Sequence, residues 1–447
     1  MSVPRLSLAA ALVSAAVLSI GAPTAEADPP WSAPAVLPGV GTGPAAATAR
    51  GNVVALTVAD RSRPPGTAAQ LLRLDPAADG TVRSATGIDL AGTAIAAYAS
   101  DHIAVAGTSI GPSGTVDAAS RVRVGTAPAA SGAPALRTLS GTQSQNVTAL
   151  AGNARGDVAI STRGGRTRLI YLRRAGTSTF RRVLTLRVSD TARGVTVAVS
   201  PSGELLVVWE DRHELFARHR GARGTWGAVH ALGPGVQSDL QAAMDATGRM
   251  LVAWKSQRVS EGEASEPAVV SFATAAPGHG FGPRRVIETV GQTGAGRFVS
   301  APGVRLAVTT RAQALLAWTG FDGARFVTRA APIAAGHIGA RQQLSPAGVD
   351  AVLGDVAVAG DGRALVLWRS NVAGADPLPG LQPHLFGNAR PAAATAFLAP
   401  EAIGGDAREV LAAPTAVIDP QTRRPIALFT DFATTQALVA VRPPVTP

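Results

Sequence analysis

Cysteine is absent from this chain of 447 residues. The chain therefore has no disulfide framework, no thiolate nucleophile and no cysteine to carry a lipid. A chain of this length buries a core large enough to fold without covalent cross-links. Aromatic residues are also scarce, at 4%, whereas glycine and proline are frequent, with 49 and 32 residues. This balance favours a β-rich globular protein with many tight turns.

Lysine is almost absent, since Lys255 is the one lysine in the sequence. The formal net charge of +11 therefore comes from arginine, and the arginines are spread along the chain, with pairs such as Arg181-Arg182 and Arg284-Arg285 as the longest clusters. A nucleic-acid-binding protein usually concentrates its basic residues on one face or helix. The distribution disfavours nucleic acid as a partner and favours anionic cell-wall polymers or acidic glycans.

Long apolar runs are missing beyond the first residues, because glycine, proline or a charged residue interrupts each of them. No membrane-spanning segment is therefore predicted in the mature chain. At the amino terminus, Arg5 precedes an apolar stretch from Leu6 to Ala22, and Ala25-Glu26-Ala27 follows. This pattern predicts a signal peptide over residues 1–27 and an exported bacterial domain over residues 28–447, secreted or held at the cell wall. A retained amino-terminal anchor is the alternative.

Four tryptophans end segments that match one another. Each segment reads as a short apolar strand, a polar turn and a second apolar strand that ends in the tryptophan. Three of the segments have a glycine at the same position in the turn, and glycine readily supplies the positive φ of a tight hairpin. The segments are Val195–Trp209, Leu240–Trp254, Val304–Trp318 and Val356–Trp368, with Gly203, Gly248 and Gly362 as the turn glycines.

The same frame recurs with weaker residues, which brings the number of predicted hairpins to eight. The second strand of a hairpin is apolar on both faces, as in Leu205–Val208, so neighbouring sheets are expected to cover both faces. The tryptophans are therefore predicted to pack between sheets and not to form sugar-stacking platforms. The four weaker copies are Gly51–Thr57, Asp101–Gly107, Gly156–Thr162 and Arg423–Phe429.

A second repeated element lies between the hairpins, with a large residue followed six positions later by an aliphatic one, and it is predicted to form an outer strand. Trp31 and Leu37 show this spacing with no hairpin before them, while the last hairpin has no such element after it. The amino-terminal segment is therefore expected to complete the last sheet. The other copies are Val82–Ile88, Ala133–Leu139, Phe180–Leu186, Trp226–Leu232, Phe281–Ile287, Ile338–Leu344 and Phe397–Ile403.

These V-A-V-x-x-x-G-x-x-L-V-x-W hairpins resemble the β-propeller superfamily, in particular secreted bacterial repeats, over essentially the whole mature chain. The resemblance implies an all-β fold: a single β-propeller of about eight four-stranded blades, with the ring closed by the amino-terminal strand joining the last blade. Seven blades, if the copy at Asp101 is not a true one, and two stacked β-sandwiches are the alternatives. The resemblance concerns architecture and implies no activity.

No catalytic residue, metal site or cofactor is predicted. Secreted propellers of the sialidase type have a Ser-x-Asp-x-Gly-x-x-Trp turn, but Ser200–Gly203 lacks the aspartate, and Tyr98 and Tyr171 lie in predicted strands. The sequence selects neither a facing carboxylate pair nor a G-x-S-x-G elbow. His213 and His219 fall on one predicted strand about 20 Å apart, too far to share a metal ion.

The residues predicted to bind a ligand are Glu210, Asp211 and Arg212, which directly follow Trp209. They are expected in a loop between the second and third strands, on the face where propellers usually hold ligands. Carboxylates beside a guanidinium suit a polar or sugar ligand.

The leading hypothesis is an exported, monomeric, non-catalytic propeller that binds a polymer, a glycan or a protein partner on one face. The first alternative is a hydrolase or lyase acting on polysaccharide through a site that its motifs do not reveal. The second alternative is a structural or adhesive scaffold at the cell surface.

Overall fold

The computed structural model describes residues 31–58, 69–110, 120–190, 192, 194–235, 239–256, 267–290, 303–309, 313–371, 383–404, 414–431 and 434–444. The signal peptide expected over residues 1–27 lies outside these ranges. The described residues are built from β-strands, and their one helical segment is a 3₁₀ turn, η1 (Pro76–Ala78). The all-β prediction is therefore confirmed.

Consecutive antiparallel strands form the first four blades. Blade 1 contains β1 (Ala35–Ala47), β2 (Val53–Val58), β3 (Ala69–Asp75) and β4 (Thr81–Ile88). Blade 2 contains β5 (Ala91–Tyr98), β6 (His102–Thr108), β7 (Val122–Pro128) and β8 (Arg137–Thr138). Blade 3 contains β9 (Asn146–Gly152), β10 (Val158–Gly164), β11 (Thr167–Arg173) and β12 (Arg181–Arg187), and blade 4 contains β13 (Val195–Val199), β14 (Leu205–Asp211), β15 (Glu214–Arg220) and β16 (Trp226–Pro234).

The remaining blades repeat this order. Blade 5 contains β17 (Leu240–Met244), β18 (Met250–Ser256), β19 (Ala268–Ala275) and β20 (Arg285–Val290). Blade 6 contains β21 (Val304–Val308), β22 (Gln313–Phe321), β23 (Phe326–Ala334) and two short outer strands, β24 (His337–Ile338) and β25 (Gln342–Gln343). Blade 7 contains β26 (Asp350–Val358), β27 (Ala364–Asn371), β28 (Pro383–Arg390) and β29 (Glu401–Ile403), and blade 8 contains β30 (Thr415–Ile418), β31 (Pro425–Thr430) and β32 (Gln436–Val441).

Strand β1 belongs to two blades. Its first residues pair with β32, with Ala35 opposite Val439 and Val36 opposite Leu438, and they complete blade 8. Its last residues pair with β2 and form the inner strand of blade 1. Just before β1, the Ser32 amide donates to the Val441 carbonyl at 2.8 Å. The predicted closure by the amino-terminal strand is therefore confirmed.

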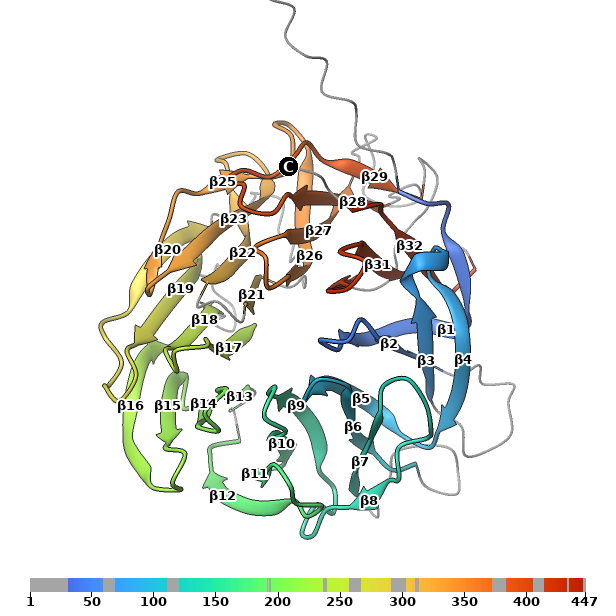
Figure 1. The fold of residues 1–447 in the computed structure, drawn as a ribbon. Helices are drawn as coiled ribbons and strands as arrows, with labels where there is room; N and C mark the ends of the chain where they lie inside the picture. The colour runs from blue at the N-terminus through green and yellow to red at the C-terminus, as the bar shows by residue number, and fades with distance from the viewer. Residues whose placement is uncertain are drawn as a thin grey trace, which may run out of the picture.

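The eight inner strands form a closed ring (Figure 1). Each inner strand contacts the inner strand of the next blade, in the order β1, β5, β9, β13, β17, β21, β26 and β30, and β30 contacts β1 again. The β5–β6 hairpin at Asp101 is one of these copies. The structure is therefore an eight-bladed propeller, and the alternatives of seven blades or two sandwiches do not apply.

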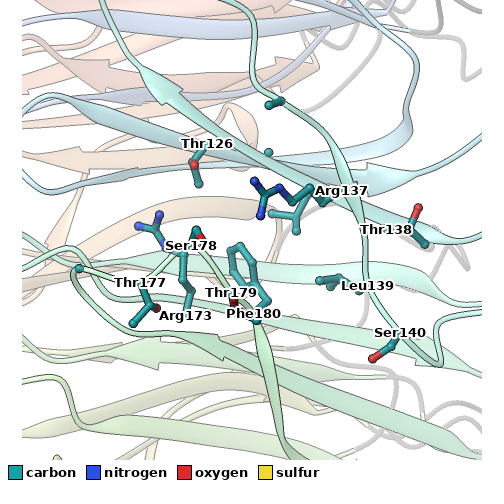
Figure 2. Close-up of a pocket in the computed structure, with 14 residues that line it drawn as sticks. Thr126, Arg137, Thr138, Leu139, Ser140, Arg173, Thr177, Ser178, Thr179 and Phe180 are labelled. Atoms are coloured by element: carbon teal, nitrogen blue, oxygen red, sulfur yellow. The ribbon is translucent and has the colours of Figure 1, made fainter.

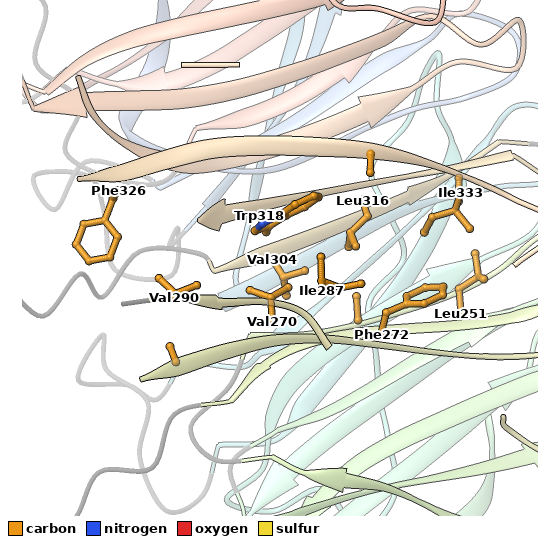
Figure 3. Packing of buried hydrophobic residues seen from close by; sticks show 14 residues of the cluster. Leu251, Val270, Phe272, Ile287, Val290, Val304, Leu316, Trp318, Phe326 and Ile333 are labelled. Carbon is orange, nitrogen blue, oxygen red and sulfur yellow. The ribbon is translucent and has the colours of Figure 1, made fainter. Parts of the chain in front are cut away.

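The hydrophobic cores lie between neighbouring blades. Trp254, Trp318 and Trp368 are each 0% exposed. Trp318 packs in a cluster that joins Val270 and Phe272 of blade 5 to blade 6 (Figure 3). A blade covered on both faces explains why the second strands are apolar throughout. The prediction that these tryptophans pack between blades is confirmed.

Candidate functional site

The connections of each blade are divided between two faces of the ring. Because successive strands are antiparallel, the turn between the second and third strands lies at the same end as the connection to the next blade. We call this end the BC face; it includes the turns at Gly165 and Arg212. The opposite end, the AB face, carries the turns between first and second strands, such as Gly203 and Gly362.

Glu210 lies inside the protein and not in a surface loop. Strand β14 runs through Asp211, so Glu210 is still part of the strand and is 1% exposed. Its carboxylate accepts from the Gly194 amide at 3.4 Å, and its own amide donates to the Gly194 carbonyl at 3.0 Å. Glu210 therefore ties blade 4 to the segment that arrives from blade 3.

Asp211 and Arg212 lie nearer the surface. The half-buried Asp211 carboxylate accepts from the Ser189 amide at 2.7 Å, and the Arg212 amide donates to the Ser189 hydroxyl at 3.2 Å. Arg212 and His213 form the two-residue turn, with φ of +50° and +67°. His213 therefore lies in the turn and not on a strand as predicted. Of the three predicted site residues, Arg212 is the one with an exposed side chain.

A buried arginine that the sequence did not single out supports this region. Arg168 is 1% exposed, and its guanidinium donates to the carbonyls of Gly165 and Ala192. Burial lowers the pKa of Arg168, as does the neighbouring Arg163 guanidinium, while the Glu210 and Asp211 carboxylates oppose the shift. The carboxylates of the predicted site thus stabilise an internal cation.

Exposed arginines gather on the BC face of blades 3 and 4. Arg166 pairs with Asp190 at 3.5 Å, but both side chains are well exposed, so the pair contributes about 0–1 kcal/mol. The exposed arginines are Arg163, Arg166, Arg187 and Arg212, and the exposed carboxylates beside them are Asp190 and Glu214.

The centre of the ring carries a second set of polar residues. Five inner-strand residues occupy the same register, each opposite the residue that precedes the buried aromatic residue of the second strand. Each of these residues is half-buried. Neighbouring blades cover both faces of a sheet, so the solvent-accessible side of an inner strand is the edge that faces the ring axis. The five residues are Thr196, Gln241, Arg305, Asp355 and Thr415.

Arg305 and Asp355 are the charged members of this set. Their Nε and Oδ1 atoms lie 3.6 Å apart, and the Asp355 carboxylate also accepts from the Ala416 amide at 2.9 Å. The Asp355 side chain is 24% exposed, yet three blades enclose it. This burial raises the pKa of Asp355, against the opposing effect of Arg305. The repeat places Arg305 and Asp355 in the same register of their blades, but their pairing depends on contact between the two blades.

Lys255 is a further unusual residue, at the position in β18 that Glu210 occupies in β14. Burial lowers the pKa of Lys255, and the Asp239 carboxylate opposes the shift. Asp239 accepts from the Gly303 amide, and a Cβ atom at Gly303 would overlap the Lys255 side chain. Groups with displaced pKa values gather at functional sites more often than elsewhere. Asp355 on an inner strand and Lys255 on a second strand are therefore two further candidate residues.

The described residues contain neither a cluster of metal-ligating side chains nor a membrane-spanning helix. No group of three histidine, aspartate or glutamate side chains there is placed to hold a metal ion. Within the same ranges, no helix combines the length and apolar character that a bilayer crossing requires.

Comparison with known proteins adds little beyond the fold. No protein-family model matches the chain, and no curated protein sequence does. Among solved structures, the polysaccharide lyase Uly1 is 9% identical over 92% of this chain and 98% of that one, with a TM-score of 0.44. An ulvan lyase of polysaccharide lyase family PL25 is 10% identical over 77% of this chain and 93% of that one, with a TM-score of 0.45.

An α-L-arabinanase of Penicillium chrysogenum, solved with arabinobiose, is 12% identical over 66% of this chain and 93% of that one, with a TM-score of 0.34. At these identities and TM-scores, the likenesses carry no argument about what this chain binds or does. The propeller assignment therefore rests on the chain's own strands and their pairing.

Proposed function

We propose that this protein is an exported, non-catalytic propeller that binds an acidic glycan or cell-wall polymer on its BC face. The observation that carries the proposal is the group of exposed arginines on blades 3 and 4. A guanidinium presents a planar fork of donors that matches carboxylate and sulfate groups. In this proposal Arg212 contacts the ligand, while Glu210 and Asp211 hold its turn in place through Gly194 and Ser189.

The test is a panel of glycans and cell-wall polymers probed at low and at moderate salt. A variant with Arg163, Arg166 and Arg212 replaced by alanine should bind an acidic polymer at least tenfold more weakly, or about 1.4 kcal/mol. The matched control replaces Arg223, Arg285 and Arg341, which are exposed arginines outside the BC-face group. It removes the same net charge and should bind as the unaltered protein does.

Three results would contradict the proposal. Binding that disappears at moderate salt, or that falls equally in both triple variants, would reduce the effect to diffuse attraction between a cationic protein and a polyanion. No detectable binding to any glycan or polymer in the panel would favour a protein partner or a scaffold role instead.

Export is tested separately. Protein recovered from the culture medium or cell wall should begin at Asp28, which amino-terminal sequencing measures. A product that keeps residues 1–27 would instead support the retained anchor.

A second candidate function, a polysaccharide-acting hydrolase or lyase, is favoured by two separate residues, Asp355 and Lys255, whose pKa values are displaced by burial. A carboxyl group with a raised pKa is suited to donate a proton, and an amine with a lowered pKa to accept one. If polysaccharides in the panel are cleaved, Asp355→Asn and Lys255→Met should each abolish the release of new reducing ends. Cleavage that survives both substitutions would exclude these two residues as its source.

A further inference from the structure

A pocket of about 500 Å³ lies between the outer parts of blades 2 and 3. Strands β7 and β8 form one wall, and the end of β11 with the loop that follows it forms the other (Figure 2). Because that loop joins a third strand to a fourth, the pocket opens toward the AB face. Its size is within the usual range of small-ligand sites, about 300–1,000 Å³.

The pocket is lined by arginine and hydroxyl groups. Arg137 and Arg173 contribute two guanidinium groups from opposite walls, and Phe180 contributes an aromatic ring (Figure 2). None of the described residues that line the pocket is acidic. Arg137 makes no ion pair with any residue in the described ranges. The hydroxyl groups, each able to donate and to accept, belong to Thr126, Thr138, Ser140, Thr177, Ser178 and Thr179.

Arg173 is held rigidly in this wall. Its side chain is 9% exposed, and its Nη2 atom donates to the Gly156 carbonyl at 3.0 Å. The guanidinium lies 4.5 Å from the Tyr98 ring centre and 6.0 Å from that of Phe180. A cation with these contacts keeps its position whether or not a ligand is present, which reduces the ordering cost of binding.

A second pocket, of about 360 Å³ between blades 6 and 7, allows an internal comparison. There Arg390 takes the place of Arg173, since it donates to the Gly362 carbonyl at 2.9 Å and lies 5.3 Å from the Phe397 ring centre. The lining of that pocket includes the Asp361 carboxylate, the polar side chains of Gln313 and Thr395 and several apolar residues, and among its described residues Arg390 is the one arginine. The arginine at the end of the third strand is thus part of the repeat, whereas Arg137 is particular to the pocket of blades 2 and 3.

We infer that the pocket between blades 2 and 3 binds a sugar unit that carries a carboxylate or sulfate group. Arg137 binds the anionic group, the edge of Arg173 adds to the positive potential, and the Phe180 ring packs against an apolar face of the sugar. The surrounding hydroxyls match the alternating donors and acceptors of a polyol. This site is independent of the proposed polymer-binding surface, which lies on the BC face.

The experiment measures binding of three short probes by calorimetry: trigalacturonate, a sulfated disaccharide and neutral maltotriose. Arg137→Ala should weaken binding of the anionic probes at least tenfold, and Arg137→Lys should restore part of it. The matched control is Arg285→Ala, because Arg285 is also an exposed arginine on an outer strand. The control should leave every affinity unchanged.

The two anionic probes separate the sources of negative charge, and tight binding of either one supports the inference. The inference is overturned if maltotriose binds as tightly as both of them, if neither anionic probe binds, or if Arg285→Ala weakens binding as much as Arg137→Ala does. Failure here is distinguishable from failure on the BC face. The triple variant of Arg163, Arg166 and Arg212 should retain binding of the short probes, and Arg137→Ala should retain binding of the polymer.

Discussion

Asp355 is the carboxylate among the five inner-strand residues at the ring centre. It faces the Arg305 guanidinium from blade 6 and the Ala416 amide from blade 8. These two contacts favour the ionised form, yet enclosure by the ring outweighs them and raises the pKa of Asp355 above the ordinary 3.8. The folded protein therefore holds the Asp355 proton more tightly than the unfolded chain does.

This shift makes stability depend on pH in a stated direction. Tighter proton binding by Asp355 in the folded state adds to the free energy of unfolding. This addition is fully present below about pH 3.8 and is lost as the pH rises through the raised folded-state pKa. Asp355→Asn keeps an acceptor for the Ala416 amide and removes the titration. The free energy of unfolding of the variant should therefore exceed that of the unaltered protein near neutral pH and approach it in acid, as measured by urea titrations across pH.

Asp322 provides a control of opposite sign. Hydrogen bonds from the backbone amides of Ala324 and Arg325 lower the pKa of Asp322. The ionised Asp322 carboxylate therefore adds to the free energy of unfolding above about pH 3.8, and this addition is lost as the pH falls through the lowered pKa. Asp322→Asn should be less stable than the unaltered protein near neutral pH. If both variants shift stability in the same direction, the assignment of the Asp355 pKa is wrong.

At the scale of elements, the turn between β14 and β15 contains avoidable strain. Both Arg212 and His213 have positive φ, a conformation that costs a residue with a side chain about 1–2 kcal/mol. His213→Gly removes this cost but adds chain entropy to the unfolded state, worth about 0.5–1 kcal/mol. The net expectation is a gain of up to about 1 kcal/mol in the free energy of unfolding, measured by chemical denaturation.

Gly203 supplies the contrasting substitution. It has a φ of +88°, and a Cβ atom there would approach Arg174 and Asp157 to 2.9 Å. Gly203→Ala should therefore destabilise the protein. A loss of stability in His213→Gly would mean that this turn is not strained.

The hairpins were predictable from the sequence because the same pattern of apolar residues, turn glycine and aromatic residue recurs in several of them. The turn glycine and the buried aromatic residue fix where each strand begins and which way the chain reverses. The outer strands were located correctly, but some of them begin later than their aromatic residue: β29 starts at Glu401, after Phe397. Phe397 packs between blades just before its strand forms its first ladder bonds.

The candidate site was less predictable because it depends on where the second strand of blade 4 ends. The repeat predicts that the second strand of blade 4 ends at Trp209, whereas β14 continues to Asp211. Because neighbouring structure covers both faces of this strand, those two further residues place Glu210 inside the protein. The Arg305–Asp355 pair and the pocket at Arg137 depend on contacts between different blades, which no local pattern encodes.

At the scale of the whole molecule, closure of the ring rests on Trp31 and the strand that follows it. Trp31 is 9% exposed and packs against Leu365 and Leu367 of blade 7 and Phe429 of blade 8. Truncation of a buried aromatic residue costs about 3–5 kcal/mol. Trp31→Ala should destabilise the ring by this amount and accelerate amide hydrogen exchange most strongly in β32, the strand that β1 closes.

Phe397 is the matched control, since it holds the equivalent position in blade 7 and is also 9% exposed. Phe397→Ala should destabilise the protein by a similar amount, but its fastest exchange should appear in β28, the partner of β29. Uniform acceleration around the ring in both variants would contradict a local role for Trp31 in closure.

The pairing of β1 with β32 has a mechanical consequence. These strands are antiparallel neighbours, and the residue that enters β1 lies beside the residue that leaves β32, as the Ser32–Val441 hydrogen bond shows. Tension applied between the two ends of the chain would therefore separate β1 from β32 by breaking their backbone hydrogen bonds one after another. Blades 2 to 7 are each a separate hydrogen-bonded sheet, and neighbouring blades pack through apolar side chains. Force applied between the two ends of the chain should therefore open the ring first at the pairing of β1 with β32.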